Sequence, residues 1–186
     1  MRARPAEALA RRRVALGFVS GALVLWLAQP TGVTLAAGAA VACVGEALRI
    51  WAAGHLNKSR EVSSSGPYRW FAHPLYVGSS IMGAGLAVAA SSAPAGAVIA
   101  IYLVTTLTAA VRNEEAFLRQ TFGDAYDRYR DAGAGEPALE HARRPFSAAR
   151  ALRNREQRAA IGLGVAVLLL LLKATYNGMF WRKPGG

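Results

Sequence analysis

Two polar runs in this 186-residue chain concentrate the side chains that could do chemistry. The first, residues 65–78, carries His73 between two tyrosines, and the second, residues 111–129, carries the adjacent carboxylates Glu114 and Glu115. Carboxylates accept hydrogen bonds from ammonium groups or ribose hydroxyls, a histidine can bond a carboxylate, and aromatic faces attract cations. If the two runs meet in space, this set of side chains suits a zwitterionic, cationic cofactor better than a phosphate.

These side chains also have simpler explanations. Tyrosine and tryptophan beside a membrane span are often interfacial anchors, prolines mark loops, and paired glutamates are often a solvated face. From spacing alone, a catalytic site and an interfacial loop therefore both stay open. We expect no metal site, because one histidine and adjacent carboxylates lack the spacing of zinc ligands, and the single Cys43 has no second thiol to join it.

The composition of the chain predicts a membrane protein with a single domain, residues 1–186. Hydrophobic residues make up 53% of the sequence, and they are gathered in blocks rather than spread evenly. The net charge of +11 comes from basic residues that flank these blocks, as the positive-inside rule predicts. We therefore expect anionic lipids, and not nucleic acid, as the partner of the basic surface.

Five apolar segments predict an all-α fold, a polytopic membrane helix bundle. The start of the chain is basic, so we expect the N-terminus inside, in the cytoplasmic membrane. A cleaved signal peptide is disfavoured because further apolar segments follow directly. The first segment is short and needs residues 29–32 to span about 30 Å of hydrocarbon. The predicted spans are residues 14–31, 33–52, 75–91, 95–112 and 159–176.

The third and fourth predicted spans are joined by a short turn, residues 91–94, which predicts an antiparallel helical hairpin. Gly78, Gly83 and Gly85 lie in the third span and permit the close backbone contact that membrane helix pairs use. With this topology both polar runs reach the cytosolic face and can form one cofactor site there. The predicted cytosolic segments are residues 53–74 and 112–158.

The second polar run continues from the fourth span, and its pattern over residues 112–130 predicts an amphipathic helix. A Gly- and Pro-rich linker, residues 132–145, comes next. At the end of this linker and beyond it, arginines form a basic face that suits anionic lipid headgroups. These arginines are Arg143, Arg144, Arg150, Arg153, Arg155 and Arg158.

Two ionisable residues, Glu46 and Arg49, lie within the second predicted span. Residues three apart on a helix share a face, so we expect an ion pair at the level of the lipid headgroups, with Arg49 extending toward them. A functional role for Arg49 is the alternative, because ionisable side chains inside a membrane often serve function.

The two runs carry motifs that occur in a known group of proteins. G-P-Y followed by H-P-x-Y-x-G spans residues 66–78, and E-E-x-x-L-x-x-x-F-G-x-x-Y-x-x-Y spans residues 114–129. Upstream, L-R-I-W-A-A-G-H-L, residues 48–56, is similar to an R-x-W-x-x-x-x-L stretch. In this order the motifs resemble those of the isoprenylcysteine carboxyl methyltransferase and phospholipid methyltransferase superfamily of integral membrane enzymes.

This resemblance implies S-adenosylmethionine as methyl donor, bound at the cytosolic face without a Rossmann domain, and a lipophilic acceptor that enters from the bilayer. It implies in-line displacement at the sulfonium methyl, for which collinear positioning and desolvation supply most of the rate. It assigns catalytic roles to Glu114 and Glu115. The cofactor-binding residues that it implies are Gly66, Pro67, Tyr68, His73, Pro74, Tyr76 and Glu114.

The chain departs from the family pattern at two positions. The family usually has arginine before the histidine of the first motif, where this chain has Ala72. The prenylcysteine branch has arginine four residues before the first glutamate, where this chain has Ala110. Both arginines are candidates to hold an acceptor carboxylate, and Arg112 is our candidate catalytic replacement, with Arg69 as the alternative.

The favoured function is therefore methyl transfer to a small lipophilic carboxylate, thiol or amine, in the manner of isoprenylcysteine carboxyl methyltransferases. An N-methyltransferase for ethanolamine phospholipids is the first alternative, because an amine acceptor needs a carboxylate rather than an arginine. A non-catalytic membrane scaffold of the same fold is the second, motivated by Ala72.

Overall fold

The computed structural model describes residues 5–56, 65–122 and 145–178. Within these ranges the chain forms helices and no strand, which confirms the prediction of a helical membrane protein. In chain order the elements are α1 (Pro5–Leu27), α2 (Gly32–His55), the 3-10 helix η1 (Gly66–Arg69), α3 (Pro74–Ala90), α4 (Ala93–Phe122), α6 (Ala148–Arg153) and α7 (Gln157–Tyr176).

Three of these helices are long and apolar enough to cross a membrane: Gly32–His55, Ala93–Phe117 and Gln157–Tyr176. The apolar helices Ala15–Leu27 and Pro74–Ala90 are shorter, so five crossings stay a prediction. Large apolar side chains on the outside of the bundle are exposed, as lipid contact requires. Examples are Phe18 and Trp26 (both 76% exposed), Val104 (66%) and Ile161 (65%).

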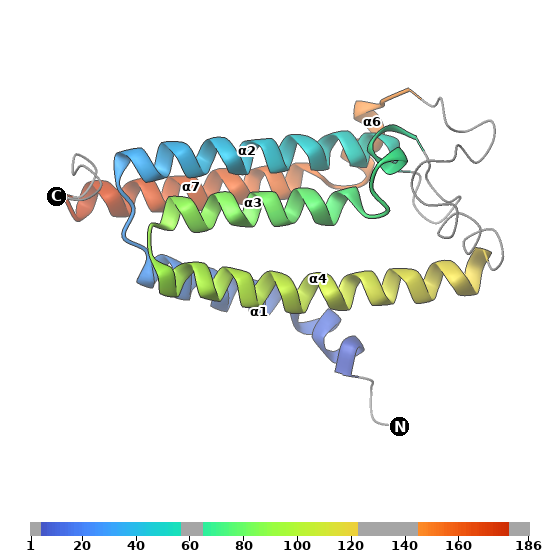
Figure 1. Ribbon diagram of the computed structural model, residues 1–186, viewed down its shortest axis with the longest axis horizontal. Helices are drawn as coiled ribbons and strands as arrows, with labels where there is room; N and C mark the ends of the chain where they lie inside the picture. Colours follow the sequence, from blue (N-terminus) through green and yellow to red (C-terminus); the bar gives the residue numbers. More distant parts are fainter. Residues whose placement is uncertain (1–4, 57–64, 123–144, 179–186) are drawn as a thin grey trace.

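Figure 1 shows how the bundle is laid out. Helices α2, α3 and α7 lie together, and α1 and α4 pack against each other beside α3. The end of α2, η1, the starts of α3 and α7, α6 and the far end of α4 all point to one end of the molecule (Figure 1), which we call the polar end. The two polar runs therefore reach the same end of the bundle.

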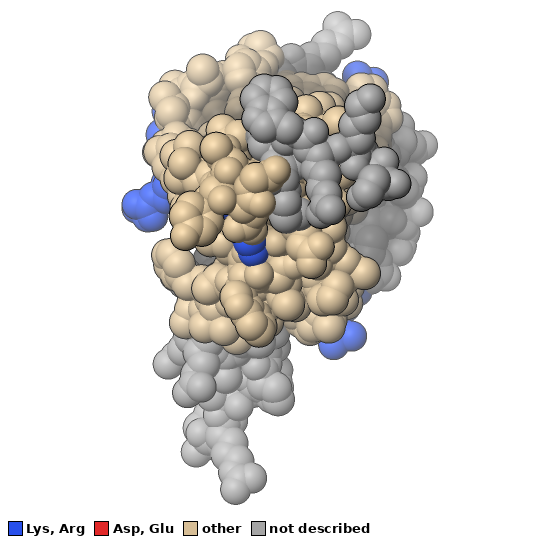
Figure 2. Space-filling view, turned by 90° about the vertical axis from the view of Figure 1, so that its left-hand side faces the viewer, with Lys and Arg blue, Asp and Glu red and all other residues tan. Residues whose placement is uncertain are grey.

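The opposite end has a different surface. Figure 2 looks onto this end, where α2 and α4 begin, and most of the described surface in view is neither basic nor acidic. The few charged groups visible there belong to lysine and arginine. Which end faces the cytosol stays a prediction from the positive-inside rule.

The backbones of α2 and α3 lie in direct contact through glycines. A Cβ atom added to Gly45 would lie 2.5 Å from the Met82 nitrogen and 2.6 Å from the Gly78 oxygen. One added to Gly85 would lie 2.6 Å from the Gly38 oxygen. Only residues without a side chain permit this approach, which is the usual way that membrane helices pack.

The close contact predicted for the glycines of α3 is confirmed, but most of it is made with α2. Gly78 and Gly85 serve the α2–α3 contact, not the hairpin of α3 and α4. Gly83 alone of the three faces α4, where an added Cβ would collide with Leu103. Residues seven apart are separated by about two helical turns and lie on the same face of a helix. Gly78 and Gly85 therefore share a face, and Gly83 lies on another.

The first helix differs from its predicted bounds of 14–31. Helix α1 begins at Pro5 and ends at Leu27, and residues 28–31 form the connection to α2. Pro30 in this connection is fully buried, and proline disfavours helix in the residue before it. Thr31 then caps α2, because its side chain accepts a hydrogen bond from the Thr34 amide.

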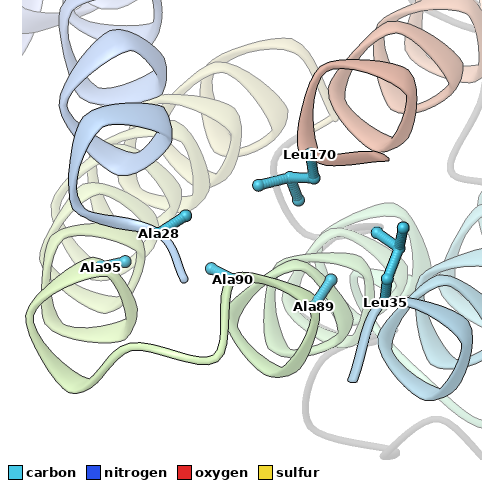
Figure 3. Close-up of a cluster of buried hydrophobic side chains, with 6 residues drawn as sticks. All are labelled: Ala28, Leu35, Ala89, Ala90, Ala95 and Leu170. Carbon is cyan, nitrogen blue, oxygen red and sulfur yellow. The ribbon is translucent and has the colours of Figure 1, made fainter. Parts of the chain in front are cut away.

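A cluster of buried apolar side chains closes the bundle at the end opposite the polar end. Ala28, just after α1, meets Ala89 and Ala90 of α3, Leu35 of α2, Leu170 of α7 and Ala95 of α4 there (Figure 3). Lys173 of α7 donates a hydrogen bond to the Trp26 oxygen at 2.7 Å. The lysine thus satisfies carbonyl groups that the end of α1 would otherwise leave unpaired.

Helix α4 continues beyond the bundle, as the amphipathic pattern predicted. It runs unbroken from Ala93 to Phe122 and carries Glu114 and Glu115 at the polar end. The rest of the predicted helix, from residue 123, and the linker 132–144 fall outside the described residues.

Gly45→Leu tests the close contact of α2 and α3. The added side chain meets backbone atoms of α3 that cannot turn aside, so we expect the full-length protein in detergent to lose about 1–3 kcal/mol of stability. The matched control is Gly164→Leu on α7, where an added Cβ has nothing within 4 Å. Equal thermal unfolding midpoints for the two variants would show that the contact is not tight.

Candidate active site

His73 sits at the start of α3, as its N-cap residue. It is the residue before Pro74, which occupies the first turn of α3 and is fully buried. Proline fits the first helical position because its missing N–H has no partner there anyway. The His73 side chain makes no capping hydrogen bond to α3, so the imidazole is available to another element.

The ring of His73 lies between the two carboxylates of α4. His73 Nδ1 is 3.7 Å from Glu114 Oε2, and His73 Nε2 is 3.8 Å from Glu115 Oε1. The imidazole is 19% exposed, and the two carboxylate side chains are 41% and 36% exposed. One residue of the first polar run therefore lies beside two residues of the second. We call His73, Glu114 and Glu115 the polar mouth.

The carboxylates change the protonation of His73. A side-chain hydrogen bond with Glu114, and then the charges of Glu114 and Glu115, raise the pKa of His73 above its usual 6.5. Burial of the ring acts in the opposite direction but does not cancel the rise. At these distances the attraction is largely ionic, so the imidazole keeps its proton to a higher pH than a free histidine does.

Of the other residues of the first motif, one contacts this ring and the rest form the turn that precedes it. The Tyr76 ring lies 5.6 Å from the His73 ring, centroid to centroid. Gly66, Pro67 and Tyr68 form η1, in which Pro67 and Tyr68 are buried. Trp70 follows and packs 5.6 Å from Trp51 of α2. The turn is thus held against the end of α2 by its aromatic side chains.

The arginine candidates are placed differently. Arg112 is exposed and lies two residues before Glu114 and three residues before Glu115 on one helix, and at the second spacing side chains can share a face. Arg69 is also exposed, at the end of η1. Neither is brought into contact with His73, so a role for Arg112 stays a prediction. Ala72 is exposed beside the polar mouth.

An apolar cavity of about 800 Å³ lies among α1, α3, α4 and α7, and we call it the chamber. Ser79 and Met82 line its wall on α3, and Leu107 lines it on α4. Ser79 follows His73 by six residues, which is about 9 Å along a helix. The chamber therefore begins close to the polar mouth and runs between the helices away from it.

A buried charge cluster lies beside the chamber. Arg49 Nε is 2.6 Å from Glu156 Oε1 and 3.5 Å from Glu46 Oε2, and the arginine also donates to Ser79 Oγ. The predicted i, i+3 pair of Glu46 and Arg49 is present and buried in the bundle, with Glu46 6% exposed. Its level relative to the lipid headgroups stays a prediction. Glu156, 6% exposed, was missed because it precedes α7 and only the fold brings it to α2.

Helix α6 is a second feature that the sequence did not reveal. Arg150 Nε donates to the Gly54 oxygen at 2.9 Å, and Asn154 Nδ2 donates to the Ala53 oxygen at 2.8 Å. Arg150 thus caps α2 and is not part of a lipid-facing surface. Arg153, Arg155 and Arg158 are exposed at the polar end, as the predicted basic face requires; Arg143 and Arg144 lie outside the described residues.

Comparisons with known proteins found similar sequences. Residues 46–125 match the family model described as phospholipid methyltransferase. A similar protein is the nickel-cobalt-cadmium resistance protein NccN of Alcaligenes xylosoxydans xylosoxydans, which is 32% identical over 104 residues. That alignment covers 55% of this chain and 47% of NccN, about half the length of the relative. No solved structure matches the chain.

The matched range contains the arginine of the charge cluster and all three residues of the polar mouth. It begins at Glu46 and ends at residue 125, so it covers the resemblance noted in the sequence except for its last residues. Residues 46–125 are thus similar to the phospholipid methyltransferase family, a group within the superfamily of integral membrane methyltransferases.

Proposed function

We propose that the protein is an S-adenosylmethionine-dependent methyltransferase that works within the membrane on a small lipophilic acceptor. The observation that carries this proposal is the position of His73 between Glu114 and Glu115, beside an apolar chamber. A cationic imidazole, two carboxylates and an aromatic ring offer one partner for each charged part of the cofactor. The chamber offers a water-poor space for an acceptor.

The side chains of the polar mouth suit this cofactor chemically. A protonated His73 can donate to the cofactor carboxylate, and Glu114 and Glu115 can accept from its amino group or ribose hydroxyls. The face of Tyr76, next to His73, attracts a sulfonium cation. When bound, S-adenosylmethionine supplies an electrophilic methyl group; the protein then has to align the acceptor with it and exclude water.

The chamber suits the apolar part of an acceptor. Its walls are almost wholly apolar, and burial of a hydrocarbon chain is favourable by about 0.8 kcal/mol per methylene group relative to water. The same apolar walls hold the reacting groups away from bulk water. An acceptor seated in the chamber would present its polar head toward Ser79 and the polar mouth.

The chemistry of the mouth bears on the class of acceptor. Two carboxylates beside His73 favour an amine over a carboxylate, because like charges repel. Arg69 and Arg112 are exposed. An N-methyltransferase for ethanolamine phospholipids is therefore the second candidate, and an isoprenylcysteine-like carboxyl methyltransferase would need an arginine such as Arg112 to turn inward.

His73→Ala and Glu114→Gln test the cofactor site. Each change removes a charged partner of the cofactor, and a charge-assisted hydrogen bond contributes about 1.5–3 kcal/mol, so we expect at least a ten-fold loss of affinity. Binding of S-adenosylmethionine to the purified full-length protein is measured by titration calorimetry. Asn113→Ala, at the exposed neighbouring position on α4, serves as control and should bind like wild type. Unchanged affinity in both site variants would refute the assignment.

The pH dependence of binding follows from the raised pKa of His73. Because the folded protein holds this proton above pH 6.5, affinity should be greatest below that pH and fall as the pH rises through the raised pKa. His73→Gln should remove this dependence, and Glu114→Gln should move the midpoint to lower pH. Ionisation of the cofactor itself affects both proteins alike. The ratio of wild-type affinity to His73→Gln affinity at each pH therefore reports on His73 alone. A flat ratio between pH 6 and 9 would contradict the role of His73.

Gly162→Leu tests the chamber. Gly162 lines it on α7 and has open space around it, so the new side chain occupies room meant for the acceptor. We expect transfer of labelled methyl groups to a lipid extract to fall several-fold, with cofactor affinity unchanged. Gly164→Leu is the matched control, because it has the same open space on the same helix but does not line the chamber.

The labelled product also separates the candidate functions. Label in an ethanolamine headgroup would support the phospholipid N-methyltransferase, and label in a base-labile ester would support the carboxyl methyltransferase. Cofactor binding without transfer to any lipid fraction would favour the non-catalytic scaffold. Equal transfer by Gly162→Leu and Gly164→Leu would exclude the chamber as the acceptor site.

A further inference from the structure

His55 is a buried histidine that the proposed chemistry does not use. It is the last residue of α2, 7% exposed, and lies in the G-H-L stretch that precedes the first polar run. Histidine is seldom buried without a partner for its ring nitrogens. The partners of the His55 ring therefore indicate its role.

One side of the His55 ring contacts Ser65 and Gly66, at the start of η1. His55 Nδ1 lies 3.1 Å from Ser65 Oγ, in a hydrogen bond between two buried side chains. A Cβ atom added to Gly66 would lie 2.5 Å from His55 Cδ2 and 2.7 Å from Nε2. Gly66 has φ +59°, a conformation that glycine adopts freely. The His55 ring thus packs against Gly66, the first residue of η1, and forms a hydrogen bond with Ser65, the residue before it.

The other side of His55 is fixed by α6. Carbonyl groups at the end of a helix have no partners within it. Here Arg150 bonds the Gly54 oxygen, Asn154 bonds the Leu56 oxygen at 3.0 Å, and the Ser147 amide bonds the Gly54 oxygen at 3.2 Å. The backbone on both sides of His55 is therefore held in place by α6 and the residues next to it.

We propose that His55 is a positioning residue for the cofactor site. Its ring links α6 and the end of α2 to Ser65 and Gly66, and so fixes η1, which carries Pro67 and Tyr68. This inference rests on the proposed function, because it predicts an effect on S-adenosylmethionine affinity. An apolar side chain of similar size could fill the space under Gly66 but could not bond Ser65.

Four variants test the link by cofactor affinity: His55→Leu, His55→Asn, Ser65→Ala and the double variant His55→Leu/Ser65→Ala. Loss of one buried hydrogen bond should weaken binding by roughly two- to ten-fold in His55→Leu and in Ser65→Ala. The double variant should be no weaker than either single variant, because both remove the same interaction. His55→Asn, whose amide can still bond Ser65, should recover most of the affinity.

A second measurement does not depend on the cofactor. Amides of Trp70 and Phe71 bond the Pro67 oxygen, so hydrogen exchange over residues 65–71 reports on the turn. This exchange should accelerate in His55→Leu but not in Lys173→Met. Lys173→Met loses the bonds to α1 at the opposite end of the bundle and controls for a general loss of stability.

The outcomes separate this inference from the proposed function. Additive losses in the double variant, or failure of His55→Asn to recover affinity, would overturn the positioning role. If wild type binds no S-adenosylmethionine, the proposed function fails, and the exchange measurement alone decides whether His55 holds the turn. Equal exchange over residues 65–71 in wild type and His55→Leu would overturn the inference in either case.

Discussion

The direct backbone contact between α2 and α3 is the constraint on which the polar end depends. Gly45 and Gly85 let the two helices approach until only backbone atoms separate them. The approach fixes the end of α2 relative to the start of α3, so His55 and His73 both reach the polar end. A side chain in this contact would move the end of α2 away from the start of α3. It would thus disturb the polar end, although neither glycine belongs to the polar mouth.

Arg49 joins a third helix to this pair. It bonds Ser79 of α3 and pairs with Glu156 at the start of α7, so one guanidinium ties three helices together. Removing one partner of such a buried pair leaves a charge without compensation, which is strongly destabilising. Because Ser79 also lines the chamber, the cluster fixes the wall that lies nearest to the polar mouth. Structural support and the candidate site are thus continuous in this bundle.

The sequence predicted the features that depend on local pattern. Apolar blocks indicated helices, Ser91 to Pro94 indicated the turn, and the two motifs indicated that His73 and Glu114 would meet. It did not predict features that depend on which helix lies beside which. The partner of Gly78 and the burial of Arg49 beside Glu156 come from the assembled bundle. The docking of α6 on α2 joins residues about a hundred apart, and no local pattern marks such a pair.

The most direct test of the central claim is the position of S-adenosylmethionine in an experimental structure of the full-length protein. The account predicts the cofactor between α3 and α4 at the polar end, with His73 and Glu114 in contact with its amino-acid part. It also predicts that the cofactor methyl group points toward Ser79 and the chamber. A cofactor bound elsewhere, or one whose methyl group faces away from the chamber, would contradict the account.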